Sequence, residues 1–83
     1  MTRDRIYITP HGSIRIRGRQ NFTDDEIKDC IIEKFPNKFH KNEYGEFELT
    51  YSHLNRKSEE IIIIVVPHNS SEKSIRIITT YSH

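Results

Sequence analysis

One histidine and two arginines recur at intervals of four residues near the N-terminus: His11, Arg15 and Arg19. On a helix, residues four apart lie along one face. Histidine is the usual acid or base in proton transfer because its ordinary pKa lies near neutral pH. The planar guanidinium of arginine can donate two hydrogen bonds to a phosphate. RNA cleavage without a metal uses these residue types: a base removes the 2′-OH proton, an acid protonates the leaving 5′-oxygen, and a cation stabilises the phosphorane.

The same residues also have plainer interpretations. His11 could be an exposed turn residue, and the arginines could belong to a solvated face. Charge does not decide between the two interpretations. Residues 1–20 carry a net charge of +4 and residues 24–33 a net charge of −4, in a chain whose total net charge is +1. The basic segment could face a phosphate, or the two segments could simply attract each other.

The segment that must position these side chains is ambiguous. Alternating isoleucines between residues 6 and 16 are compatible with a β-hairpin whose arginines face water. The alternative is a strand over residues 5–9 and a helix that opens at Pro10, since proline suits a first helical turn. Gly12 and Gly18 would each weaken that helix by about 1 kcal/mol relative to alanine, so propensity favours the hairpin.

A helix is predicted over residues 24–34. Thr23 is suited to the N-cap, and Glu26, three residues later, completes a capping box. Phe22 and Ile27 occupy the two positions of a hydrophobic staple. The apolar residues at helical spacing are Ile27, Cys30, Ile31 and Phe35. This pattern predicts an amphipathic helix with Cys30 packed in the core, ending before Pro36.

Beyond a turn-rich segment the pattern acquires a period of two, which predicts strands. Phe47, Leu49 and Tyr51 alternate with polar residues, and residues 74–81 alternate again, with Ile77, Thr79 and Tyr81 expected on one face. The run Ile61–Val66 is β-branched throughout, so it should form a central strand that Pro67 ends. Short links predict an antiparallel meander. The expected fold is α+β: a three- to four-stranded antiparallel sheet packed by one or two N-terminal helices, in a single domain over residues 1–83.

Composition limits the compartment and the cofactors. The chain of 83 residues has one cysteine, so no internal disulfide can form and a reducing, cytoplasmic location is expected. The longest apolar run is far too short to span a bilayer, and the first residues lack the apolar stretch of a signal peptide. No motif for a metal, a nucleotide or a catalytic serine is present, so neither a metal nor a cofactor is expected.

The segment from His11 to Arg19, the capped helix start Phe22–Ile27 and the ending Ile77–Tyr81 together resemble small toxin domains of the RelE-like and BrnT kind. These belong to a broad group with barnase-like and colicin-type ribonucleases. The resemblance implies an endoribonuclease toxin that acts on mRNA or tRNA and is held by an antitoxin. On this hypothesis the catalytic residues are His11, Arg15, Arg19 and Tyr81, and the RNA-binding residues are Arg17 and Thr79.

A second hypothesis is a non-enzymatic interaction module, such as a phage-encoded inhibitor or a regulatory protein that binds a protein partner. A chain with one strongly predicted helix and a strand that is apolar on both faces can leave one face of its sheet uncovered. Such a face suits a partner or a second copy of the chain, so a homodimer is a further expectation.

Overall fold

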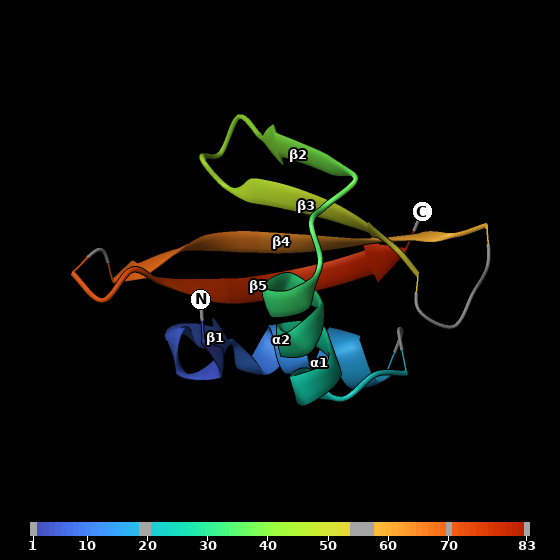
Figure 1. Cartoon of the computed structure of the whole chain (residues 1–83), viewed down its shortest axis with the longest axis horizontal. Coiled ribbons are helices and arrows are strands. Elements are labelled where there is room, and N and C mark those ends of the chain that lie inside the picture. The colour runs from blue at the N-terminus through green and yellow to red at the C-terminus, as the bar shows by residue number, and fades with distance from the viewer. Residues whose placement is uncertain (1, 19–20, 54–57, 70, 83) are drawn as a thin grey trace.

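The computed structural model of the chain describes residues 2–18, 21–53, 58–69 and 71–82. These residues form one sheet with two helices packed against it, so the α+β class is confirmed (Figure 1). In chain order the elements are η1 (Arg3–Arg5), β1 (Ile6–Ile8), α1 (Pro10–Gly18), α2 (Asp24–Glu33), β2 (Lys38–Lys41), β3 (Phe47–Ser52), β4 (Glu60–Asn69) and β5 (Ser74–Ser82).

The sheet is larger than predicted and is not purely antiparallel. Its five strands follow the order β1-β5-β4-β3-β2, in which β3 to β5 form the expected antiparallel meander and β2 extends it. Strand β1, which lies within the strand expected over residues 5–9, pairs parallel with β5, and the two helices that follow it carry the chain back across the sheet. Strand β2 was missed because its four residues are all exposed and include a single apolar side chain, Phe39, so no alternation marked it.

Residues 10–18 form a helix, so the hairpin that propensity favoured is wrong. Pro10 occupies the first position of α1, and the Thr9 hydroxyl accepts a hydrogen bond from the Gly12 N–H at 3.0 Å, as an N-cap does. A Cβ on Gly12 would lie 2.9 Å from the carbonyl oxygen of Ile77. The glycine that argued against a helix is therefore what allows α1 to lie directly against the backbone of β5.

Helix α2 begins as predicted and ends one residue earlier. Both hydrogen bonds of the capping box between Thr23 and Glu26 are present. Lys34 has extended backbone angles and caps the C-terminus. Phe35 therefore lies outside the helix and is 95% exposed, which corrects its predicted place on the apolar helix face. The following Pro36 disfavours helical angles at Phe35.

Strand β4 is central, between β3 and β5, as predicted for Ile61–Val66. It does not end at Pro67, because its pairing with β5 continues to Asn69. Pairing with β3 stops at Val65, opposite Phe47. Proline is tolerated there because β4 is an edge strand on that side beyond Val65.

An irregularity in β5 changes which of its side chains face the helices. Ile64 pairs with Thr79 but the next residue, Val65, pairs with Ile77, so Ile78 is an extra residue without a partner in the β4 register. Alternation restarts after this bulge, and Thr80 is buried at 1% exposure on the same face as Ile77. The prediction that Thr79 and Tyr81 share the face of Ile77 is therefore wrong.

The two faces of the sheet differ in what covers them. The core lies on the face that both helices cover, and Figure 1 shows both helices below β5, with α2 in front of α1. Its buried residues are Ile6, Ile16, Phe22, Ile27, Cys30, Leu49, Tyr51, Ile61, Ile63, Val65 and Ile77. We call the opposite side the open face; the strand registers place on it Tyr7, Lys38, His40, Glu48, Thr50, Ile62, Ile64, Val66, Arg76, Thr79 and Tyr81.

Candidate functional site

Helix α1 has two sides with different neighbours. On one side, the Ser13 hydroxyl donates to both carboxylate oxygens of Asp24 at 3.1 Å, and Arg17 donates to Asp24 at 3.4 Å. This side therefore faces α2. Because a helix turns through about 100° per residue, His11 and Arg15 lie on the side of α1 turned away from α2.

The structure brings His11 and Arg15 together. The Arg15 Nε–H donates to Nε2 of His11 at 3.4 Å, one helical turn apart. His11 is exposed and Arg15 is half-buried. In this contact the Nε2 lone pair of His11 points toward the Arg15 guanidinium. Arg19 lies outside the described residues.

Arg17 is placed differently from the other basic candidates. Its guanidinium pairs with Asp24, at 3.4 Å, on the side of α1 that faces α2. Arg3 similarly forms a bidentate pair with Asp29, with both hydrogen bonds at 2.7 Å. Part of the basic N-terminal charge therefore pairs with the acidic helix. Both pairs are partly exposed, so each contributes little to stability.

Thr79 and Tyr81 lie on the open face because of the bulge at Ile78. Tyr81 is 37% exposed. Burial, together with the nearby Glu48 carboxylate, raises the pKa of the Tyr81 phenol. The phenol therefore keeps its proton at neutral pH and can donate a hydrogen bond. Ile64 of β4 pairs with Thr79 of β5 on one side and with Glu48 of β3 on the other. The three side chains therefore lie on the same face of the sheet.

The bulge is also the place where α1 docks. The Thr9 hydroxyl donates to the Ile78 carbonyl at 3.4 Å. Gly12 packs against the backbone of Ile78 and of the residue before it, Ile77. Helix α1, which carries His11 and Arg15, therefore docks on the same strand that carries Thr79 and Tyr81. We call the four residues His11, Arg15, Thr79 and Tyr81 the α1–β5 site. Together they offer a proton acceptor, a cation and two hydroxyl donors.

Sequence reasoning missed other residues on the open face. Glu48 was treated only as part of a polar alternation, and its proximity to Tyr81 depends on the bulge. The rings of Tyr7 and His68 lie 4.3 Å apart, and Arg76 is in register with Tyr7. No local pattern predicts this cluster, because Tyr7 of β1 is far along the chain from His68 of β4 and Arg76 of β5.

Other reactive side chains have structural places. Cys30 is buried in the core, and burial raises the pKa of its thiol, which does not suit a nucleophile. The His53 ring stacks on Phe22 at 5.0 Å. Among the described residues, no three His, Cys, Asp or Glu side chains cluster so that they could hold a metal ion. In the same part of the chain, no helix is long and apolar enough to cross a membrane.

Comparisons with models of protein families, with curated proteins and with solved structures find no match to this chain. The functional argument therefore rests on the geometry of the chain itself.

Proposed function

We propose that the chain is a small endoribonuclease of the toxin-like kind, which cleaves mRNA or tRNA without a metal by attack of the 2′-OH on the phosphodiester. The observation that supports this most directly is the His11–Arg15 pair on α1, which docks on β5, the strand that carries Thr79 and Tyr81. The resemblance of the His11–Arg19 segment and of the capped helix start to RelE-like and BrnT domains is a second support.

In this proposal each residue has one role. His11 removes the proton of the 2′-OH, whose oxygen attacks phosphorus. Arg15 stabilises the negative charge of the phosphorane. The phenol of Tyr81 donates to a phosphate oxygen, and Thr79 adds a second hydroxyl donor. The bond to the 5′-oxygen breaks, this oxygen takes up a proton from water, and the products are a 2′,3′-cyclic phosphate and a 5′-hydroxyl end. His11 returns its proton to solvent.

The test uses purified chain and a single-stranded RNA labelled with a fluorophore and a quencher. His11→Ala and Arg15→Ala are expected to lower the cleavage rate by about 10²-fold or more, because each removes a group that acts in the transition state. Ile14→Ala is the matched control, since Ile14 is an exposed residue of the same helix. Its rate should equal that of the unaltered chain.

The identity of the products tests the mechanism separately. Mass spectrometry should find 2′,3′-cyclic phosphate ends, and an oligonucleotide with 2′-deoxyribose throughout should stay intact. If the purified chain does not cleave RNA, or if Ile14→Ala is as impaired as His11→Ala, the proposal fails. The alternative, a binding module without catalysis, depends on a different feature of the molecule, an apolar groove between the end of α2 and strands β2 and β3.

A further inference from the structure

A groove of about 440 Å³ lies on the core side of the sheet, between the end of α2 and the strands β2 and β3. It exists because α2 ends at Glu33, while the sheet continues to the edge strand β2, whose residues are all exposed. Apolar side chains line it, among them Ile32, Phe35, Phe39 and Phe47. We call it the β2 groove.

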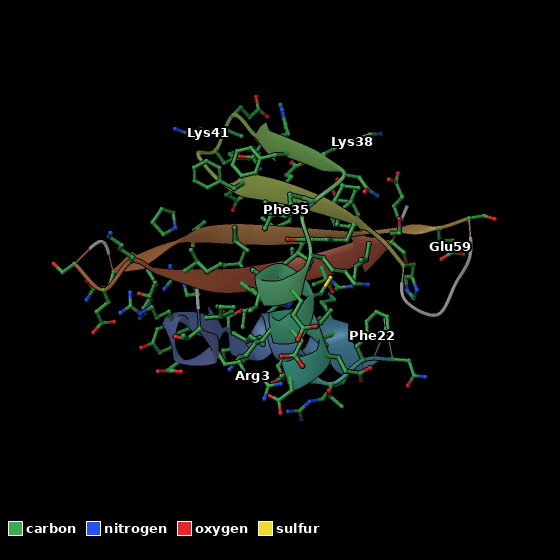
Figure 2. All side chains as sticks on the ribbon, viewed as in Figure 1. Arg3, Phe22, Phe35, Lys38, Lys41 and Glu59 are labelled. Carbon is green, nitrogen blue, oxygen red and sulfur yellow. The ribbon has the colours of Figure 1, made fainter. Side chains whose placement is uncertain are left out.

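Large aromatic side chains at the β2 groove are left in water. Phe35 is 95% exposed and Phe39 is 64% exposed, although the groove beside them is apolar. Figure 2 shows Phe35 in the stretch between α2 and the sheet. Exposed apolar patches that border a groove are typical of interaction sites.

The groove ends at a free strand edge. In the part of the chain that the structure describes, β2 pairs with β3 alone. The Asn42 N–H donates to the Glu46 carbonyl at 2.9 Å, toward β3. Backbone groups alternate in direction along a strand, so His40 faces β3 as Asn42 does. Phe39 and Lys41 therefore direct their N–H and C=O groups to the free edge. An extended segment can add to such an edge as a further strand.

The charge of this edge selects the kind of segment. Strand β2 reads Lys38, Phe39, His40, Lys41, with no acidic residue. At the rim of the groove Lys34 stands next to Glu33, so the excess of positive charge comes from β2 itself. Figure 2 shows Lys38 and Lys41 at the two ends of β2. A second copy of the chain paired along β2 would place these cations opposite one another, which is unfavourable. An acidic segment would instead complement them.

We propose that the β2 groove binds an extended, acidic segment of a partner protein. This segment adds to β2 as a sixth strand through the backbone of Phe39 and Lys41, and its apolar side chains, at alternate positions, enter the groove. The partner's carboxylates then lie on the open face beside Lys38, while Lys41 adds positive charge on the groove side. The inference does not rest on RNA cleavage, because the α1–β5 site involves other residues at the opposite end of the strand order.

The test uses synthetic peptides of about ten residues, labelled with fluorescein, in which leucine alternates with glutamate. A matched peptide carries lysine in place of glutamate. The acidic peptide is expected to bind at least about tenfold more tightly than the basic one in fluorescence anisotropy. Lys38→Glu combined with Lys41→Glu should reverse this preference.

Single variants locate the binding. Phe39→Ser is expected to weaken binding about tenfold or more, because it removes an aromatic anchor from the groove. Tyr44→Ser is the matched control: Tyr44 is 78% exposed but does not line the groove, so binding should be unchanged. Both residues are exposed, so circular dichroism should show that both variants fold.

Amide hydrogen exchange tests the mode of binding. The amides of Phe39 and Lys41 should exchange rapidly in the free chain and become protected with the acidic peptide, while that of His40, which points to β3, changes little. Absence of binding, equal binding of both peptides, or binding without protection at Phe39 and Lys41 would each overturn the proposal. A dimer that Phe39→Ser dissociates, seen by light scattering, would assign the groove to a second copy and overturn it as well.

Discussion

Gly12 lies where α1 meets β5, and the absence of a side chain lets the two backbones approach closely. Gly12→Ala should lower the free energy of unfolding by about 1–3 kcal/mol, because the new Cβ would lie 2.9 Å from the Ile77 carbonyl oxygen. This cost outweighs the gain in helix propensity, which is about 1 kcal/mol. Urea denaturation followed by circular dichroism measures the change.

Gly18 supplies the control for this substitution. It belongs to the same helix, and a Cβ there would meet nothing within 4 Å. Gly18→Ala should therefore leave the stability unchanged or raise it by up to about 1 kcal/mol. Equal effects of the two substitutions would show that propensity alone governs α1 and that the contact with β5 does not matter.

Tyr51 makes stability depend on pH in a defined window. Burial and the neighbouring Cys30 raise the pKa of the Tyr51 phenol from 10.0 to about 12. Between these values the unfolded chain releases the proton and the folded chain retains it. The contribution of Tyr51 to stability should therefore be constant up to about pH 10 and fall as the pH rises toward 12. Urea denaturation in Tyr51→Phe should show less of this loss, and a profile identical to that of the unaltered chain would contradict the assignment.

At the scale of elements, α2 depends on its capping box. Thr23→Ala removes the hydroxyl that accepts from the Glu26 N–H at 3.2 Å and should destabilise the chain by about 1 kcal/mol. Thr23→Ser retains the hydroxyl and should recover most of this loss. Thermal unfolding by circular dichroism would show it, and equal melting temperatures for the alanine and serine variants would exclude a role for the cap.

Elements with strong local signals were predictable from the sequence, whereas those decided by distant contacts were not. The cap and apolar spacing of α2 and the β-branched run of β4 act within a few residues. The helix at residues 10–18 depends on a close approach to β5, about 65 positions away in the chain, and a propensity argument cannot include that contact. A stronger signal was available in Thr9 followed by Pro10, which suits the start of a helix.

The candidate site was partly predictable for the same reason. The shared side of His11 and Arg15 follows from a spacing of four once the helix exists. The face of Thr79 and Tyr81 does not follow from alternation, because one extra residue at Ile78 reverses it. Bulges have no reliable sequence signature, so the open-face position of Tyr81 and its proximity to Glu48 required the structure.

At the scale of the whole molecule, the proposed activity should be visible in cells. Induced expression of the chain in a bacterial host should arrest growth and degrade RNA. The double variant His11→Ala, Arg15→Ala should permit growth at the same level of soluble protein, and Ile14→Ala should remain inhibitory. Normal growth with intact RNA during strong expression of the unaltered chain would count against the nuclease.

The parallel pairing of β1 with β5 has a consequence for when this molecule becomes functional. Strand β1 is the first strand in the chain and β5 the last, so β1 and the docked face of α1 have no partner until the ribosome has released residues 74–82. During synthesis the α2 cap and the β2–β4 hairpins can form early, while the α1–β5 site must form last. A chain that terminates before Ser74 would contain His11 and Arg15 but lack the strand on which α1 docks.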